Sequence, residues 1–247
     1  MLEILEYPFE INKIIRKKKI LKKFLLKNKN LVNIKIAILG ASTTFEVVEQ
    51  IELFLLKSGF RPEFYFTEYG QHYNVVIFED KELFNFKPDI VYIHISNEYI
   101  DGLNNHNISS LKKAKLEIKK LKNVWKKLSL NFNCSIIQDN FELPETRSLG
   151  NYSFTSNKSS NQAISLLNQM INEEANNLSF LNIVDRFYLS SKMGLDTWKD
   201  YSLWLSSKYS ISYNGITHLT YTLSKVINSL FGKSKKCLVL DLDNTLW

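Results

Sequence analysis

Short apolar runs alternate with longer amphipathic stretches along most of the chain. Runs dense in Ile, Val and aromatic residues predict strands at 34–39, 63–67, 90–95, 135–138 and 181–184. Apolar positions at helical spacing predict helices at 11–26, 45–56, 111–130, 162–178 and 216–231. Because strands and helices take turns along the chain, we expect a three-layer α/β fold, with a parallel, doubly wound sheet between two layers of helices.

Three segments are expected along the 247 residues. Residues 1–30 predict a basic amphipathic helix, and residues 31–231 predict one α/β domain with a sizeable core. Residues 232–247 predict a linker, Gly232-Lys-Ser-Lys-Lys236, and the start of a further domain. Thr43 and Thr44 precede the 45–56 helix and are candidates to cap it.

The formal charge of +7 comes largely from two lysine-rich runs, 13–29 and 112–127. Both runs have helical apolar spacing, so a solvated lysine face is expected, with contact to a membrane surface or nucleic acid as the alternative. Neither run is expected to interleave its lysines with exposed stacking aromatics, and neither is set in a known binding module, so we expect no nucleic acid and no membrane partner. The two cysteines, Cys134 and Cys237, predict buried free thiols. Without a long apolar run or signal core, a cytoplasmic protein is expected.

The last residues carry the sharpest chemical signal. An apolar run, Cys237-Leu-Val-Leu, leads into Asp241-Leu-Asp243-Asn-Thr245. This pattern is typical of a buried strand that ends at a ligand site, with Asp241 and Asp243 on one side of the extended chain. Two such carboxylates can share Mg²⁺ and a phosphate, and the Thr245 hydroxyl can bond a phosphoryl oxygen. A solvated acidic turn is the alternative.

The string KKCLVLDLDNTLW resembles the first motif of the haloacid dehalogenase (HAD) superfamily of phosphotransferases, and most closely its FkbH-like (HAD-IIIC) branch. The resemblance implies Asp241 as the nucleophile that forms an aspartyl-phosphate, Asp243 as general acid/base, and Mg²⁺ held partly by Asp241. It also implies that further catalytic residues lie in a C-terminal HAD domain of the same polypeptide. The implied function is dephosphorylation of a phosphorylated three-carbon donor, 1,3-bisphosphoglycerate, and loading of the glyceryl unit onto an acyl carrier protein for polyketide or related pathways.

Four positions near predicted strand ends resemble the SGNH hydrolase pattern, which implies a flavodoxin-like fold. Ser42 matches the nucleophile block, Gly70 the second block and Asn97 the oxyanion-hole asparagine, while His218 matches the catalytic base. A serine at a helix start can attack a carbonyl if a histidine takes its proton and N–H groups bind the oxyanion.

The acidic residue expected three positions before the histidine is replaced by Gly215. An imidazole without such a partner is a poorer base, unless Asp196 or Asp200 substitutes in space. Two alternatives to the HAD function therefore stay open: a serine esterase or acyltransferase, and a noncatalytic module that docks a carrier protein. The aromatic segment at 196–212 predicts either core packing or the mouth of a pocket or docking face.

Overall fold

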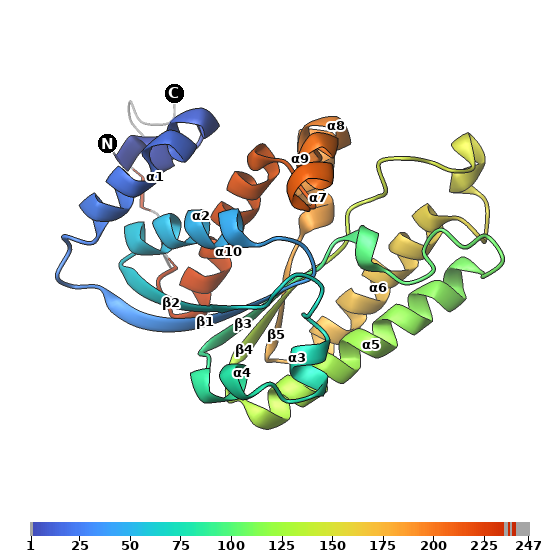
Figure 1. The fold of residues 1–247 in the computed structure, drawn as a ribbon, viewed down its shortest axis with the longest axis horizontal. Coiled ribbons are helices and arrows are strands. Elements are labelled where there is room, and N and C mark those ends of the chain that lie inside the picture. The colour runs from blue at the N-terminus through green and yellow to red at the C-terminus, as the bar shows by residue number, and fades with distance from the viewer. Residues whose placement is uncertain (1, 235–236, 238, 241–247) are drawn as a thin grey trace.

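A computed structural model describes residues 2–234, 237 and 239–240. Its sheet contains five parallel strands in the order β2-β1-β3-β4-β5. This is the flavodoxin-like order of doubly wound folds. The strands are β1 (Val32–Gly40), β2 (Phe60–Phe66), β3 (Ile90–His94), β4 (Ser135–Asp139) and β5 (Leu181–Val184). The expected three-layer architecture is confirmed (Figure 1).

Helices cover both faces of the sheet (Figure 1). The main helices are α1 (Ile11–Leu25), α2 (Phe45–Lys57), α5 (Ser110–Asn131), α6 (Ser160–Asn177) and α10 (Tyr213–Leu230). The shorter ones are α3 (Asn74–Ile77), α4 (Lys81–Phe86), α7 (Arg186–Met193), α8 (Leu195–Trp198) and α9 (Tyr201–Ser207), with 3-10 turns η1 (Leu2–Leu5), η2 (Asn97–Tyr99) and η3 (Gly150–Phe154). The structure shows α5 and α6 packed on one face of the sheet, with α2, α7 and α10 on the other.

Side chains alternate between these two cores along the central strands. In β3, Val91 and Ile93 belong to the core beneath α5 and α6, whereas Ile90 and Tyr92 belong to the core beneath α2 and α10. All five β3 residues are buried, as expected for a parallel strand covered on both faces. Helix α1 forms a further, outer element, because its buried side chains pack on α2.

The carboxyl ends of all five strands meet at one edge of the sheet, where ligands bind in open α/β folds. The chain leaves the domain at the opposite edge. There Lys233 Nζ donates to the carbonyl oxygens of Ser58, at 2.8 Å, and Gly59, at 3.2 Å, and the Gly59 carbonyl also accepts from Val32 N–H, at the start of β1. Lys233 therefore lies at the edge of the sheet opposite to the ligand edge.

Two sequence predictions near the end of the chain differ from the structure. Cys237, Val239 and Leu240 are exposed and lie in no strand, because none of the five strands pairs with them and an isolated strand leaves its backbone groups unpaired. The expected buried thiol at Cys237 is therefore wrong, while Cys134 is half-buried just before β4. Asp241, Asp243 and Thr245 lie outside the described residues, so their predicted roles stay predictions. None of the described helices combines the length and the apolar composition needed to cross a bilayer.

Candidate functional site: a sealed serine beside a charged cavity

Ser42 lies two residues beyond the end of β1, at the ligand edge of the sheet, but it is closed off from solvent. Its side chain is only 2% exposed. Its hydroxyl Oγ donates to the hydroxyl of Ser210, 3.2 Å away, in the loop between α9 and α10. A serine hydroxyl is a far weaker proton acceptor than an imidazole, so this partner does not activate Ser42 as a nucleophile.

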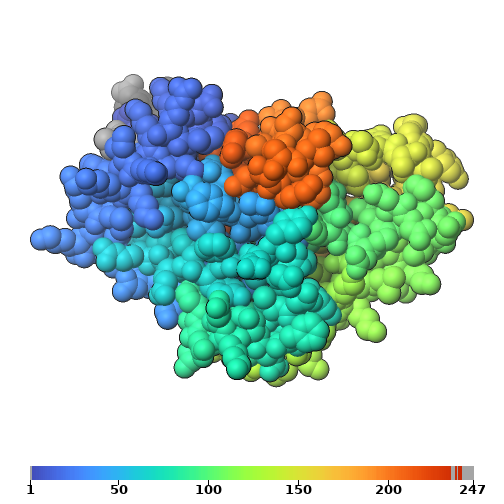
Figure 2. Space-filling view, in the orientation of Figure 1, coloured from blue at the N-terminus to red at the C-terminus, as the bar shows by residue number. Residues whose placement is uncertain are grey.

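The loop that follows α9 holds this cover in place. Thr43 N–H donates to the carbonyl oxygen of Lys208 at 3.1 Å, and Thr43 Oγ1 donates to the carbonyl oxygen of Ser207 at 2.7 Å. Thr44 occupies the N-cap position of α2, but its side chain makes no capping hydrogen bond. The predicted capping role is thus not observed. In Figure 2 the orange segment with α8 and α9 fills the space between the blue N-terminal part and the green central part.

The candidate oxyanion donors all have partners within the protein. Gly70 N–H donates to the carbonyl oxygen of Ala41 at 3.1 Å, and Asn97 Nδ2 donates to the carbonyl oxygen of Glu142 at 3.1 Å. An oxyanion hole requires donors aimed at the place where charge develops. The structure does bring Ser42, Gly70 and Asn97 to one edge of the sheet, yet in this conformation their polar groups serve the fold rather than a substrate.

His218 is not beside Ser42, which corrects the expected pairing of the two. Its ring lies in an aromatic cluster with Phe9, at a centroid distance of 5.2 Å, and Tyr7, at 6.1 Å. Burial, and then the charge of Lys192, lower the pKa of His218. His218 lies about 1.7 helical turns beyond the Ser212 N-cap of α10, and from there it reaches the N-terminal segment instead of the loop that covers Ser42.

Gly215, at the position expected to be acidic, has no room for a side chain. A Cβ there would lie 3.0 Å from the carbonyl oxygen of Trp198 and 3.3 Å from the Trp198 ring. The two proposed substitutes do not direct His218 either: Asp200 caps α9 by accepting from Leu203 N–H at 3.1 Å, and Asp196 lies exposed in the first turn of α8. The described residues therefore form no Ser-His-Asp triad.

A fully buried ionic network lies beside Ser42. Arg186 Nε is 2.7 Å from Glu142 Oε2, and Arg186 Nη2 donates to Glu142 Oε1 at 3.1 Å and to Ser210 Oγ at 3.3 Å. Arg186 Nη1 lies 3.5 Å from Asp139 Oδ2. All three charged side chains are 0% exposed. This network fixes Ser210, and through it Ser42.

The carboxylate of Asp139 connects this network to β3. Tyr92 Oη donates to both carboxylate oxygens of Asp139, at 2.9 and 2.8 Å, and His94 Nδ1 lies 3.0 Å from Asp139 Oδ2. Burial, and then the charge of Asp139, raise the pKa of Tyr92 well above its usual value. Tyr92 therefore stays a neutral donor. Its hydrogen bonds to Asp139 hold the ends of β3 and β4 together.

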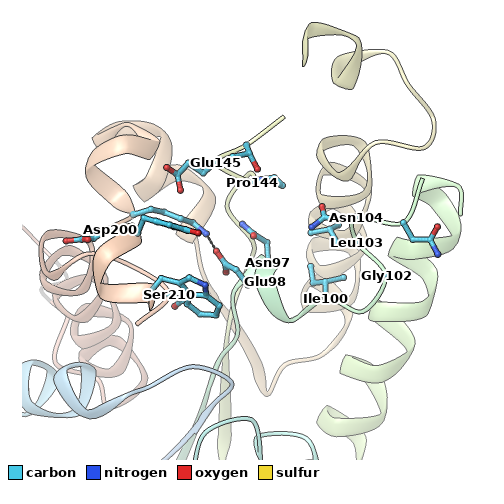
Figure 3. A pocket seen from close by; sticks show the side chains of 15 residues that line it. Asn97, Glu98, Ile100, Gly102, Leu103, Asn104, Pro144, Glu145, Asp200 and Ser210 are labelled. Atoms are coloured by element: carbon cyan, nitrogen blue, oxygen red, sulfur yellow. Dashed lines mark hydrogen bonds and ion pairs between the residues drawn. The ribbon is translucent and has the colours of Figure 1, made fainter. Parts of the chain in front are cut away.

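A cavity of about 460 Å³ opens on the outer side of this network. Lys199 lines it and pairs with Glu98 and, at 3.2 Å, with Glu142 Oε1. Burial alone would raise the pKa of Glu98, but the charge and hydrogen bond of Lys199 outweigh it, and that pKa is lowered. Figure 3 shows Asn97 and Glu98 between the α9 side, with Ser210 and Asp200, and the loop with Ile100 and Leu103.

Two aromatic side chains from the 196–212 segment stand at the cavity. Tyr201 is 67% exposed, and the half-buried Trp204 packs edge-on against Tyr99 at a centroid distance of 6.0 Å. Trp198, in contrast, is 0% exposed and belongs to the core. Both sequence alternatives for this segment are thus partly right: it supplies two core residues, Trp198 and Ile211, and one aromatic cavity wall. Polar groups beside aromatic walls are typical of the lining of small-molecule pockets.

Sequence reasoning missed the charged network. Asp139 ends β4, so the rule that strand ends carry function could have identified it. Arg186 and Glu142 stand in segments without any motif, so no comparable signal marks them, whereas Lys199 lies in the 196–212 segment, for which a pocket mouth was one of the two expectations. Within the described part of the chain, no group of three or more His, Cys, Asp or Glu residues is arranged to hold a metal ion.

Comparison with known proteins places this geometry in a family. The chain is similar to the crystallised N-terminal part of the protein BF1531 from Bacteroides fragilis, described as containing a phosphatase domain complexed with Mg. The two share 23% identity and a TM-score of 0.80, over 93% of this chain and 61% of that chain. An extracellular lipase from Streptomyces rimosus shares the fold at 14% identity and a TM-score of 0.52, over 80% of this chain and 99% of the lipase. No curated protein matches. The model of the FkbH N-terminal domain matches residues 35–228, so the chain belongs to the FkbH N-terminal domain family.

Proposed function

We propose that this chain forms the N-terminal part of an FkbH-like protein whose chemistry resides in a HAD-type phosphatase domain beginning near Asp241. That protein would act on a phosphorylated three-carbon acyl donor, 1,3-bisphosphoglycerate. Water would hydrolyse its C3 phosphate ester by way of an aspartyl-phosphate, and an acyl carrier protein thiol would attack the C1 carbonyl and displace the C1 phosphate, which leaves the glyceryl unit as a thioester. The observation that carries the proposal is the order of features: an FkbH N-terminal domain over 35–228, followed directly by the DLDNTLW motif. The similar Bacteroides protein, of which this chain spans 61%, is described as containing a phosphatase domain.

Each motif residue has a role in this proposal. Asp241 attacks the phosphoryl group and forms an aspartyl-phosphate, while Asp243 supplies a proton to the leaving group and later removes one from the attacking nucleophile. Thr245 donates a hydrogen bond to a phosphoryl oxygen. Carboxylate oxygens such as those of Asp241 and Asp243 are the donors that Mg²⁺ prefers, and the ion would offset the charge of the phosphoryl group.

The alternative of a serine esterase is disfavoured by the sealed Ser42. Its hydroxyl is paired with Ser210, His218 lies in a different cluster, and the N–H groups of Thr43 and Gly70 already donate to carbonyl oxygens. A working hydrolase needs a base, a free oxyanion hole and access for the substrate. We therefore assign the α/β body a binding and docking role, in which the cavity beside Lys199 and Trp204 receives a polar part of the donor or carrier.

The test uses the full-length protein with 1,3-bisphosphoglycerate, holo acyl carrier protein and Mg²⁺. Phosphate release and glyceryl loading should occur in the wild type and vanish in Asp241→Asn. The matched control is Asp196→Asn, an exposed aspartate that should keep full activity. Phosphate release that persists in Asp241→Asn would remove Asp241 as the nucleophile and the proposal with it.

Ser42→Ala separates the two chemistries in the same preparation. On the proposed function, this variant should release phosphate at the wild-type rate, and neither protein should hydrolyse p-nitrophenyl acetate above the buffer rate. Hydrolysis of that ester by the wild type, lost in Ser42→Ala, would instead establish the esterase alternative.

A further inference from the structure

Helix α1 uses its apolar face entirely within the domain. Its buried side chains, Ile14, Leu21 and Leu25, pack in the cluster that joins α1 to α2. Two of its lysines are neutralised by α2: Lys18 pairs with Glu46 at 2.6 Å and with Glu49, and Lys22 pairs with Glu52 at 2.7 Å. The helix is therefore a fixed part of the fold, on the outside of the α2 layer (Figure 1).

The opposite face of α1 combines strong positive charge with exposed apolar surface. Ile20 is 57% exposed and Phe24 is 42% exposed, and their spacing of four residues places them on one side of the helix. Exposed basic side chains surround them: Arg16, Lys17, Lys19, Lys23 and Lys27. Within the described part of the chain, none of these five makes an ion pair, unlike the inner lysines. We call Ile20, Phe24 and these five residues the α1 outer face.

A hollow of about 550 Å³ adjoins the α1 outer face. It lies between η1 and α1, and its lining includes Ile4, Lys17 and Ile20 together with Glu3 and Glu10. Its volume exceeds that of any single side chain, so an apolar residue of a partner could enter it while the partner's charges meet the surrounding lysines.

The composition of this surface selects among three possible occupants. A membrane-bound amphipathic helix inserts its apolar face, but the apolar face of α1 is buried against α2. Nucleic acid requires cations along its phosphates with aromatic stacking, whereas here two apolar side chains, Ile20 and Phe24, occupy the centre of the face. An acidic helix with one or two apolar residues matches both the basic periphery and the apolar centre.

We propose that the α1 outer face docks an acidic helix of the acyl carrier protein. The identity of this partner rests on the proposed function, whereas its chemistry, an acidic helix with an apolar anchor, rests on the surface itself. Positive charges at the periphery attract and orient the carrier, and Ile20 and Phe24 supply the contact that excludes water.

The test measures binding of holo acyl carrier protein to the full-length protein by calorimetry at low and moderate NaCl. Lys17→Glu/Lys23→Glu should weaken binding at least tenfold, and the wild-type affinity should fall with salt. Lys112→Glu/Lys115→Glu is the matched control, because it makes the same charge change at exposed positions of α5 and should retain wild-type affinity. Ile20→Ala/Phe24→Ala should also weaken binding, while Leu130→Ala, at a 74% exposed position of α5, should not.

Equal affinities of the wild type and Lys17→Glu/Lys23→Glu would overturn the docking proposal, as would an equal loss in the α5 control. A second result would also overturn it: the wild type binds phosphatidylglycerol vesicles, and Lys17→Glu/Lys23→Glu loses this binding but keeps its affinity for the carrier. That result would assign the α1 outer face to lipid. Phosphate release from 1,3-bisphosphoglycerate is measured in parallel without carrier. If it depends on Asp241 while the carrier fails to bind, the docking proposal alone is refuted and the phosphatase proposal stands.

Discussion

The buried guanidinium of Arg186 should be one of the most sensitive positions in this domain. Replacing Arg186 by Met removes its contacts with Glu142, at 2.7 and 3.1 Å, and with Asp139, at 3.5 Å. Both carboxylates are 0% exposed, so water cannot take the place of the lost cation. Removing one partner of a buried ion pair costs about 3–5 kcal/mol, because the remaining charges stay buried with less compensation; here Lys199 still pairs with Glu142, and Tyr92 still donates to Asp139.

A chain of 247 residues loses about 2 °C of melting temperature per kcal/mol, so we expect Arg186→Met to melt about 6–10 °C below the wild type. Melting is followed by circular dichroism at pH 7. Arg147→Met is the control, because Arg147 is exposed and makes no ion pair in the described residues. It should shift the transition by about 1 °C or less.

A second substitution tests the cause of the loss. Removing a carboxylate as well, in Arg186→Met/Glu142→Gln, takes away part of the uncompensated charge and should recover about 1–2 kcal/mol relative to Arg186→Met. A loss of less than about 1 kcal/mol of unfolding free energy in Arg186→Met would show that Arg186 does not stabilise the fold by compensating buried charge. The same would follow if the double variant lost the sum of the losses measured for Arg186→Met and for Glu142→Gln alone.

Three further outcomes are expected. Gly215→Asp should lower the free energy of unfolding by about 1–3 kcal/mol, because its Cβ would lie 3.0 Å from the Trp198 carbonyl oxygen, and the variant should not hydrolyse p-nitrophenyl acetate. A stable variant that hydrolyses this ester would show that a triad can form. Burial, and then the charge of Lys120, lower the pKa of His72 from 6.5 to about 4. Between these pH values the unfolded state binds a proton that the folded state does not, so the free energy of unfolding falls by up to about 3 kcal/mol as the pH drops from 6.5 to 4. In urea titrations at pH 7 and pH 4, His72→Gln should lose less stability than the wild type on acidification, and equal losses would contradict this assignment. Trp204→Ala should keep a cooperative melting transition, like its exposed neighbour variant Leu205→Ala, because Trp204 is half-buried at the cavity wall; a collapsed transition would instead make it a core residue.

Regular elements with strong periodicity were predictable from the sequence, and short ones were not. The strand predicted at 181–184 is β5, and the helix predicted at 111–130 differs from α5 by one residue at each end. The second strand begins at Phe60 rather than residue 63, because pairing with β1 extends it back to the turn at Gly59. Helices α3, α4, α8 and α9 contain four to seven residues, too few to show a helical repeat.

The candidate site was predictable only in part. Ser42, Gly70 and Asn97 were expected at strand ends, and the parallel sheet does bring them to one edge. The sequence offered no means of seeing that their donors are already bonded to Ser210, Ala41 and Glu142, because those partners come from distant segments.

The sequence by itself determined the fold class, the succession of strands and helices along the chain, and the family resemblance, because hydrophobic periodicity and short motifs are local properties of the chain. Only the tertiary structure decided which polar groups face each other. It paired Ser42 with Ser210, turned His218 toward Phe9, and buried Arg186 between two carboxylates. Burial and pairing depend on how separate segments pack in three dimensions, and they decide whether a serine at a strand end is a nucleophile or a sealed part of the core.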